Sequence, residues 1–467
     1  MIARCGGYVS AIFRRIMPDP IVLAVLLAGF VALLAMVFGR FPAVPDAGVF
    51  GRATALADGL IGSEGMWKLL TFAMQMCLVL VTGHALASSR PVARLIRSLA
   101  ALPRTGASAA ALVGFTACVA GLLNWGLGLI VGALLAREVG RVAAASGKPI
   151  HYPLIVAAGY MGLLVWHGGL SGTAPLSCTS VEQLRNMLPA AFVETSGDNI
   201  VTPLRRSLFS MQNLLITGGL VVLAPVLLAL LAPRDGVCAA PPAPPLSDAE
   251  ETRRAEPETL ASRLDRSRLL AVLLAGAAIA LVVHFLVQRG VMRLGLNEVN
   301  LAMFGLGMLA HGSLRRYMQS ATEGVRGCAG ILVQFPIYAA VMSMMVTSGL
   351  IGQVADHIAS VSTPETLPML TCWSAALLNL AVPSGGGQWA VQGPIALQTA
   401  LQMGVEPGRI IMAVAYGDQL TNMLQPFWAL PLLAITGVKA RDIVGYCAVV
   451  MLAAFAWVSL MLLVWKS

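Results

Sequence analysis

Three consecutive glycines interrupt an apolar stretch late in the sequence, where Gly385, Gly386 and Gly387 follow Ser384 and precede Gln388. Lipid leaves exposed backbone unsatisfied, so such a segment must line a cavity or be buried in protein. A helix that restarts near Gln388 directs free N–H groups and its positive dipole end into that cavity. We predict a carboxylate-binding site here, with Ser384 and Gln388 as further donors. The alternative is a turn at which two helices pack closely.

A second interruption, at residues 124–128, divides an apolar stretch in the first half of the chain. We predict that Gly126 and Gly128 expose backbone to the same substrate. Asn124, together with Asn379 beside the first motif, offers a side-chain carbonyl to a cation or a donor to the substrate. The alternative for both asparagines is a clamp between helices.

Two further apolar spans contain prolines, Pro175 and Pro426, each preceded by polar residues. Proline removes a backbone hydrogen bond and kinks a helix, and the freed carbonyls are suited to Na⁺. We therefore predict a site for a coupling ion or for substrate at these breaks; a kink without a ligand is the alternative. The polar residues concerned are Ser171, Thr173, Asn422 and Gln425.

Asp418 lies well inside the apolar span 410–433, which contains no Lys or Arg. An ionised carboxylate near mid-membrane costs about 2.5–3.5 kcal/mol on insertion scales, so a bound cation or a proton must offset it. We predict that Asp418 binds the coupling ion, H⁺ or Na⁺, rather than the anionic substrate. His167, nearer the end of its span, is predicted to be a hydrogen-bonded structural residue.

The sequence contains no G-x-S-x-G, H-E-x-x-H or Walker motif, and its eight cysteines form no C-x-x-C. We therefore predict no cofactor, no metal centre beyond a possible Na⁺ site, and no enzymatic activity. A membrane-embedded enzyme that uses His167, Ser171 and Asp418 on a lipid-like substrate is the alternative, but no base and orienting residue lie at a useful spacing. A channel is a third hypothesis.

Composition places the chain in a lipid bilayer. Hydrophobic residues make up 57% of the 467 residues and charged residues only 11%, against roughly a quarter in soluble domains. Apolar runs of spanning length recur throughout, so we predict an all-α polytopic membrane protein. The net charge is +9, and the charged residues lie between the spans. This arrangement fits the positive-inside rule and argues against a nucleic-acid partner. The predicted spans are 21–38, 69–87, 154–166, 214–231, 269–287, 301–309, 331–346, 410–433 and 443–465.

Basic clusters set the predicted topology. Arginines precede the first span and flank the stretch 107–136 on both sides. This pattern places the N-terminus and both flanks on the cytoplasmic side of a bacterial inner membrane. The stretch has arms of about 17 and 12 residues, shorter than full spans, so we predict a re-entrant hairpin from the cytoplasm. The segment 348–367 has no Lys or Arg, and the following hairpin, 368–403, is predicted to enter from the periplasm.

The two halves of the chain resemble each other. Leu122-Leu123-Asn124 recurs as Leu377-Leu378-Asn379, and a Pro-rich, charged segment, 233–268, is predicted to be a cytoplasmic linker between the halves. We predict a first repeat at 1–232 and, within 269–467, a connecting span followed by a second repeat of inverted topology. The predicted architecture has about nine full spans, two hairpins and helices broken at the midplane. Such an architecture is typical of secondary carriers.

Several stretches also resemble the short-chain fatty acid transporter family, of the acetoacetate and butyrate uptake type, within the ion transporter superfamily. The resemblance implies uptake of small monocarboxylates coupled to a cation gradient, and by analogy to the superfamily a homodimer with an elevator motion; a carrier for another small organic anion is the alternative. The family pattern has His where this chain has Gln388, and Gly where it has His167. The matching stretches are MQMCLVLVTGHALASS (74–89), NWGLGLIVGALLAREV (124–139), ILVQFPIYA (331–339), NLAVPSGGGQWAVQGP (379–394) and AVAYGDQLTNMLQPFWALP (413–431).

Overall fold

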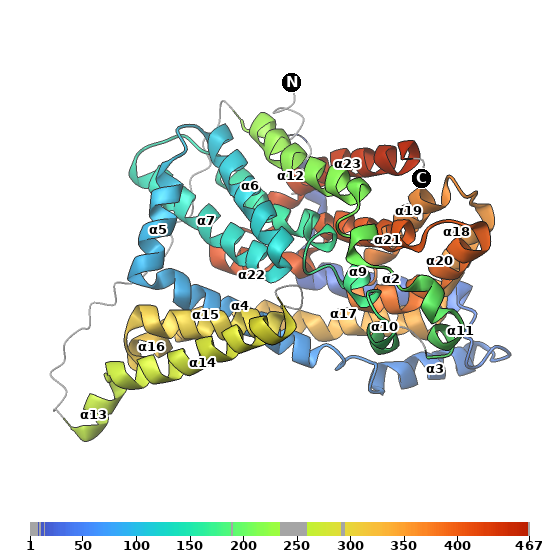
Figure 1. Cartoon of the computed structure of the whole chain (residues 1–467), viewed down its shortest axis with the longest axis horizontal. Coiled ribbons are helices and arrows are strands. Elements are labelled where there is room, and N and C mark those ends of the chain that lie inside the picture. Colours follow the sequence, from blue (N-terminus) through green and yellow to red (C-terminus); the bar gives the residue numbers. More distant parts are fainter. Residues whose placement is uncertain are drawn as a thin grey trace.

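Every regular element that the structure describes is a helix (Figure 1). The structure is a computed structural model, and it describes residues 8, 11–13, 15–187, 190–233, 259–290 and 295–465. The prediction of an all-α protein is confirmed. Most of the predicted linker 233–268 lies outside the described residues, as do Cys5 and Cys238.

Seven helical segments within the described ranges are long and apolar enough to cross a membrane. Their outer surfaces are strongly apolar: on the helix Arg268–Arg289, Leu269 is 68% exposed and Leu273 60% exposed. Exposed aliphatic surface on this scale is stable against lipid rather than water. The seven segments are α2 (Pro20–Phe38), α4 (Leu70–Ser88), α6 (Gly106–Leu123), α12 (Met211–Leu231), α14 (Arg268–Arg289), α16 with α17 (Leu314–Thr347) and α23 (Ala440–Val464).

The order of elements recurs in the two halves. Each series ends with a long helix, an amphipathic helix, a hairpin, a broken helix and a final span. Helix α14, preceded by α13 (Leu260–Asp265), lies between the series, and α10 (Val181–Met187) and α11 (Ala190–Ile200) follow only the first broken helix. The first series is α2, α3 (Val49–Ile61), α4, α5 (Arg90–Ala101), α6, α7 (Trp125–Ala145), the first broken helix and α12. The second is α15 (Leu296–His311), α16 (Leu314–Val325), α17 (Ala329–Thr347), α18 (Leu350–Val361), α19 (Leu367–Asn379), α20 (Gly385–Met403), the second broken helix and α23.

The two hairpins have their bases at opposite ends of the molecule. We call α6 with α7 hairpin 1 and α19 with α20 hairpin 2. The base of hairpin 1 meets the end of α5 around a small cavity lined by Ala100, Pro103 and Val139. The base of hairpin 2 meets α18 around a cavity lined by Ile358 and Thr371. Helices α5 and α18 lie on the left and right of Figure 1, so the hairpin tips approach each other from opposite sides.

Hairpin 1 is longer than its apolar residues predict. Its first arm has 18 residues, in agreement with the predicted 17 or so, but its second arm has 21, so the prediction of about 12 residues for the second arm is wrong. The second arm continues through the basic cluster because buried Glu138 forms a 2.6 Å ion pair with Arg141, one turn further along the helix. Charged residues that pair along a helix extend it past the end of its apolar run.

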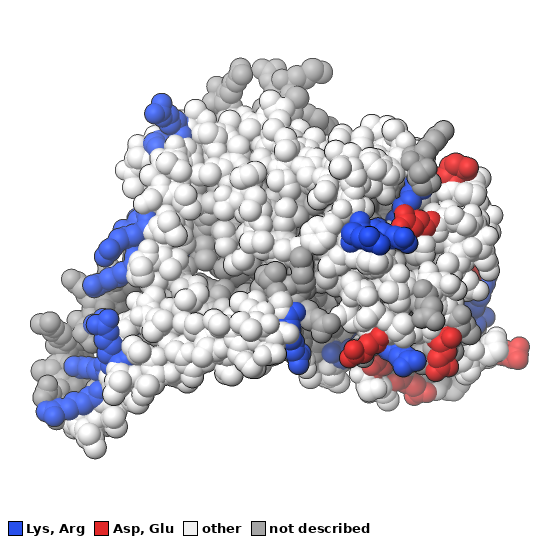
Figure 2. All heavy atoms as spheres, viewed as in Figure 1, with Lys and Arg blue, Asp and Glu red and all other residues white. Residues whose placement is uncertain are grey.

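The helices form two layers (Figure 1). Helices α15 and α16 pack with α4, α14 packs with α15, and α17 packs with α2 and α4. The other layer holds hairpin 1, both broken helices, α12 and α23, with hairpin 2 packed along α21 (Pro407–Thr421). Lys and Arg without visible Asp or Glu gather near α5 and α13, whereas Asp and Glu lie together with other Lys and Arg at the opposite end of the molecule (Figure 2).

The charge distribution gives a topology prediction. A cysteine that replaces Ser146, beyond hairpin 1, is expected to react only with a reagent on the cytoplasmic side, and one that replaces Thr363, before hairpin 2, only from the periplasmic side. Both side chains are exposed, and the six described native cysteines are buried. The measurement is labelling of intact cells and of inverted vesicles with an impermeant maleimide. Labelling of both positions from one side would refute the inverted repeat.

Candidate transport site

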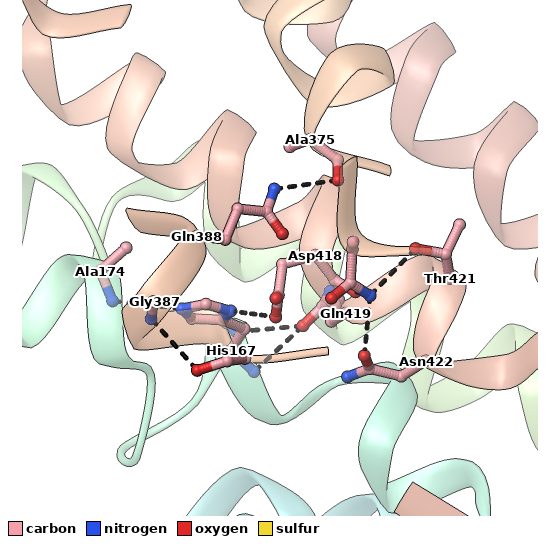
Figure 3. A network of polar contacts seen from close by, with 12 residues as sticks. His167, Ala174, Ala375, Gly387, Gln388, Asp418, Gln419, Thr421 and Asn422 are labelled. Carbon is pink, nitrogen blue, oxygen red and sulfur yellow. Dashed lines mark hydrogen bonds and ion pairs between the residues drawn. The ribbon is translucent and has the colours of Figure 1, made fainter. Parts of the chain in front are cut away.

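The two broken helices meet at the centre of the polar network in Figure 3. The first consists of α8 (Tyr152–Gly159), η1 (Met161–Leu164), η2 (Trp166–Gly168) and α9 (Thr173–Ser177). The second consists of α21, η6 (Asn422–Leu424) and α22 (Pro426–Thr436). Pro426 begins the new helix at a position where its missing N–H costs nothing. The breaks remove regular backbone bonding from both helices, and side chains replace it.

His167 and Asp418 form the ionisable pair of this network. His167 Nδ1 lies 2.7 Å from Asp418 Oδ2, and the two side chains are 0% and 2% exposed. The Ala174 N–H donates to His167 Nε2 at 3.1 Å. Because a backbone N–H only donates, Nε2 must accept, and the imidazole proton resides on Nδ1, facing Asp418. The imidazole is therefore neutral in this arrangement and does not cancel the charge of an ionised Asp418.

His167 lies just beyond its predicted span, 154–166, close to where the sequence places it. It lies in η2, at the break of the first interrupted helix, and it is fully buried. Its hydrogen bonds agree with the expected satisfied histidine, but its partner is the one carboxylate that the sequence marks as functional.

Gln419 holds the backbone of the first break in place. Its Oε1 accepts from the N–H groups of His167 at 3.1 Å and Gly168 at 3.2 Å. Asn213 on α12 donates to the Gly168 carbonyl at 2.9 Å and accepts from the Tyr416 hydroxyl at 2.9 Å. The imidazole thus has a fixed orientation toward Asp418.

Asn379, at the tip of hairpin 2, joins the second break. Its Nδ2 donates to the Asp418 carbonyl at 2.7 Å, to Thr421 Oγ1 at 3.0 Å and to Asn422 Oδ1 at 2.9 Å. Gln425 Nε2 donates to the Asn379 carbonyl. The structure therefore brings the predicted ion-site residues Asn379, Asp418, Asn422 and Gln425 into one network. Tyr160 belongs to it as well, since its hydroxyl donates to the carbonyls of Asn422 and Gln425 at 2.8 and 3.1 Å.

The glycines of hairpin 2 lie directly beside this pair. Ser384 caps α20 by accepting from the Gly387 N–H at 3.1 Å. A methyl group on Gly385 would lie 3.0 Å from Trp166 and 3.1 Å from His167, and one on Gly387 would lie 3.0 Å from Met342. The N–H groups of the first helical residues, Gly385 and Gly386, are not used within α20, as at any helix N-terminus.

Gln388 has a different environment from the one predicted. Its Nε2 donates to the Ala375 carbonyl at 2.9 Å and to Gln392 Oε1 at 2.8 Å. Both N–H groups of the amide are thereby used to join α20 to α19. The side chain is 0% exposed, and its Oε1 has no hydrogen-bond donor. The oxygen, rather than the N–H groups, is the part of Gln388 that is left to meet a ligand.

The tip of hairpin 1 forms a separate group on the other side of the first break. Asn124 Oδ1 accepts from the N–H groups of Gly126 and Leu127 and so caps α7, while Ser171 Oγ accepts from the Trp125 N–H at 3.0 Å. A methyl group on Gly128 would lie 2.5 Å from the backbone of α6, so this glycine permits the close packing of the hairpin arms. A methyl group on Gly126 would lie 3.1 Å from Leu296. Thr173 begins α9, next to Ala174.

Aromatic side chains extend from the polar pair toward the other layer. Trp166 stacks on His167 with ring centroids 4.3 Å apart and meets Trp125 edge-on at 6.4 Å. Trp125 in turn contacts Trp428 at 5.2 Å and Phe72 of α4 at 6.0 Å. The site therefore has a polar end at hairpin 2 and an aromatic end at hairpin 1.

Sequence reasoning missed Gln419, Asn213, Tyr160 and Tyr416. Gln419 follows Asp418 directly and is a second polar residue deep in an apolar span, which was the available signal. Asn213 and the two tyrosines lie in ordinary amphipathic or apolar context, and only the three-dimensional contacts identify them.

The fold and this site define a multi-pass membrane transporter built from hairpins and broken helices. The profile of the short chain fatty acid transporter family matches residues 1–465. A protein of Escherichia coli (strain K12) is 38% identical over 97% of both chains, and one of Haemophilus influenzae is 35% identical over 96% of both; each is described as a candidate short-chain fatty acid transporter. The chain therefore belongs to the short-chain fatty acid transporter family. It is a transporter and not an enzyme, which excludes the alternative of a membrane-embedded enzyme.

Solved structures with similar arrangements exist at low sequence identity. The Alcanivorax borkumensis YdaH transporter has a TM-score of 0.41 and 18% identity, covering 96% of this chain and 98% of that one. Neisseria gonorrhoeae MtrF, described with a class of antimetabolite efflux pumps, has a TM-score of 0.35 and 16% identity, covering 98% of this chain and 97% of that one.

Proposed function

We propose that the protein is a secondary carrier that takes up short-chain monocarboxylates, such as butyrate or acetoacetate, together with a cation. The observation that carries the proposal is the position of the α20 N-terminus: Gly385 lies against both Trp166 and His167. A helix N-terminus, a buried ionisable pair and an aromatic surface thereby meet at one place. The names of the related proteins, described as candidate short-chain fatty acid transporters, support the substrate class.

The carboxylate is proposed to bind at the start of α20. The N–H groups of Gly385 and Gly386 point out of the helix end, and the dipole of α20 favours an anion there. Absence of side chains at Gly385, Gly386 and Gly387 lets the carboxylate approach the backbone. Ser384 contributes its hydroxyl, whose oxygen already accepts from Gly387 but whose proton is available to donate.

The short alkyl chain is proposed to lie along the aromatic residues. Trp166 stacks on His167 of the polar pair and contacts Trp125. Trp125 in turn contacts Trp428 and Phe72. Aromatic faces provide apolar contact area for a chain of a few carbons. Hairpin 1, with Asn124, Gly126 and Ser171, closes this end of the site in the proposal.

Coupling to a cation follows from charge. An ionised Asp418 and a substrate carboxylate place two negative charges in a buried region, and the neutral imidazole of His167 cancels neither. Charges of the same sign repel strongly where the dielectric is low. A cation bound at Asp418 removes this repulsion, so cation and substrate bind better together than alone, which is the requirement for symport.

Alternating access is proposed to use the two layers. Phe335 and Tyr338 of α17, in one layer, contact Phe427 of α22, in the other, at centroid distances of 4.2 and 4.8 Å. Such an aromatic interface has few directional bonds to break when one layer slides. We propose an elevator motion of the layer that holds the hairpins, in a bacterial inner membrane with a cytoplasmic N-terminus and in a homodimer.

Uptake into proteoliposomes tests the proposal. Labelled butyrate is expected to accumulate above equilibrium when an inward Na⁺ or H⁺ gradient is imposed, and to equilibrate without accumulation when the gradient is absent. Imposing the two gradients separately identifies the ion, and liposomes without protein are the control. Absence of uptake for a series of short monocarboxylates would overturn the substrate class, and equal final levels with and without a gradient would overturn coupling.

A further inference from the structure

We propose that the side-chain oxygen of Gln388 completes the binding site of the coupling cation, together with the carboxylate of Asp418. This inference rests on the proposed cation coupling, and it assigns Gln388 to the cation rather than to the substrate. The observation behind it is an acceptor in the protein interior: Gln388 Oε1 is buried and has no hydrogen-bond donor. A buried amide oxygen without a donor is unfavourable unless a ligand meets it.

The orientation of the Gln388 amide is fixed by its neighbours. Its Nε2 lies 2.9 Å from the Ala375 carbonyl, which only accepts, so the amide nitrogen must face α19 and the oxygen must face away from it. Gln392 fixes the second N–H at 2.8 Å and is itself held by donating to Ser374 Oγ at 2.9 Å. A rotation that exchanged nitrogen and oxygen would place two oxygens in contact on α19.

The same contacts place this oxygen beside Asp418. Ala375, to which Gln388 is bonded, packs against Gly417: a methyl group on Gly417 would lie 2.6 Å from Ala375 Cβ. Asp418 directly follows Gly417 and pairs with His167. His167 in turn lies against Gly385, which is one helical turn before Gln388. Figure 3 shows the Gln388 oxygen on the side of its amide that faces Asp418.

An amide oxygen and a carboxylate that face each other are both acceptors, and a positive particle between them satisfies both. A proton on Asp418 would donate to Gln388 Oε1, and a Na⁺ ion would be coordinated by both oxygens. The chemistry common to the two is a monovalent cation held between a carboxylate and an amide oxygen. His167 is not the acceptor of this cation, because its Nδ1 proton faces Asp418 and its Nε2 accepts from Ala174.

Few other ionisable groups face this place. The packed elements α9, α19 and α20, all described, contain no Lys, Arg, His, Asp or Glu. Arg409 is in the first turn of α21, whereas Asp418 is near the end of that helix. Arg441 and Asp442 are in the first turn of α23, at the end of that helix that is far from the site. Buried titratable groups nearby include Tyr416 on α21, Tyr160 bonded to the Asn422 carbonyl, and Cys372 beside Gly417.

Direct cation binding to the detergent-solubilised full chain, without substrate, tests the proposal. One arm measures binding of radioactive ²²Na⁺, and the other measures protons bound on a pH jump with an indicator dye. Gln388→Met keeps the length of the side chain but removes the oxygen, and it is expected to weaken binding of the cation by about 10- to 100-fold, the range for a hydrogen bond or ligand to a charged group. Gln334→Met is the matched control: Gln334 is also buried with an oxygen that lacks a donor, but it lies on α17.

A second variant removes the dependence on folding. Gln388→Glu places a second carboxylate opposite Asp418, and the extra proton is expected to be held more tightly than in Gln388→Glu combined with Asp418→Asn, a difference that a misfolded protein would not show. Unchanged cation binding in Gln388→Met, or equally tight proton binding in Gln388→Glu with and without Asp418→Asn, would overturn the assignment of Gln388. Because no substrate is present, these outcomes are independent of the proteoliposome test, in which failure of butyrate uptake overturns the proposed function instead.

Discussion

Asp418→Asn is expected to abolish accumulation of butyrate against its gradient while downhill exchange continues. Asn is nearly isosteric and keeps an acceptor oxygen for the Nδ1 proton of His167, which lies 2.7 Å from the native carboxylate. The asparagine side chain has no charge, so it neither repels the substrate carboxylate nor attracts the coupling cation. Initial rates of counterflow and the final accumulation ratio in proteoliposomes with imposed gradients separate the two functions.

The matched control for this variant is Asp356→Asn. Asp356 carries the same substitution on an exposed side chain, where it forms a 3.6 Å ion pair with Arg40, and exposed pairs of this kind contribute little to stability. Accumulation is expected to stay at the level of the unsubstituted protein in this control. If Asp418→Asn concentrates butyrate as well as the unsubstituted protein does, Asp418 is structural and cation binding occurs elsewhere.

Asp418 could be recognised from the sequence as a candidate functional residue, because it is an acidic residue in a span that contains no Lys or Arg. Its partner could not. His167 is 251 residues away, and no periodic pattern links a residue in one broken helix to a residue in the other. The expectation that His167 is a structural histidine came from considering its own span alone. Only the crossing of the two breaks shows that its proton faces the carboxylate.

The spans were predictable for a related reason. Apolar runs report where lipid contacts the chain, and α2, α4, α12, α14 and α23 follow them closely. Pairings between charged side chains do not appear in hydropathy, so the extension of α7 through Glu138 and Arg141 was missed. Hydrogen bonds between side chains were missed in the same way: nothing in the glycine motif indicates that both N–H groups of Gln388 are engaged by Ala375 and Gln392.

Gly385→Val is expected to abolish substrate binding, with a loss of affinity of more than about 100-fold, because it removes access to several hydrogen bonds from the helix end at once. Its Cβ would lie 3.0 Å from Trp166 and 3.1 Å from His167, and the two methyl groups of valine need space that the stacked rings occupy. Gly385→Ala adds only the Cβ, so the rings need to move by a few tenths of an ångström and a much smaller loss is expected. Binding of labelled butyrate to purified protein measures both.

Gly276→Val separates this effect from a general intolerance of valine in a span. Gly276 lies in the middle of α14, and a methyl group there meets no atom within 4 Å, so the control is expected to bind butyrate as the unsubstituted protein does. Gly385→Val is expected to remain folded, because the contacts of Asn379 and Gln388 hold the hairpin independently of Gly385. Thermal unfolding checks this point. A folded Gly385→Val variant that binds butyrate normally would show that the glycines permit only close packing of hairpin 2 on the first broken helix, and the carboxylate would then have to bind away from the start of α20.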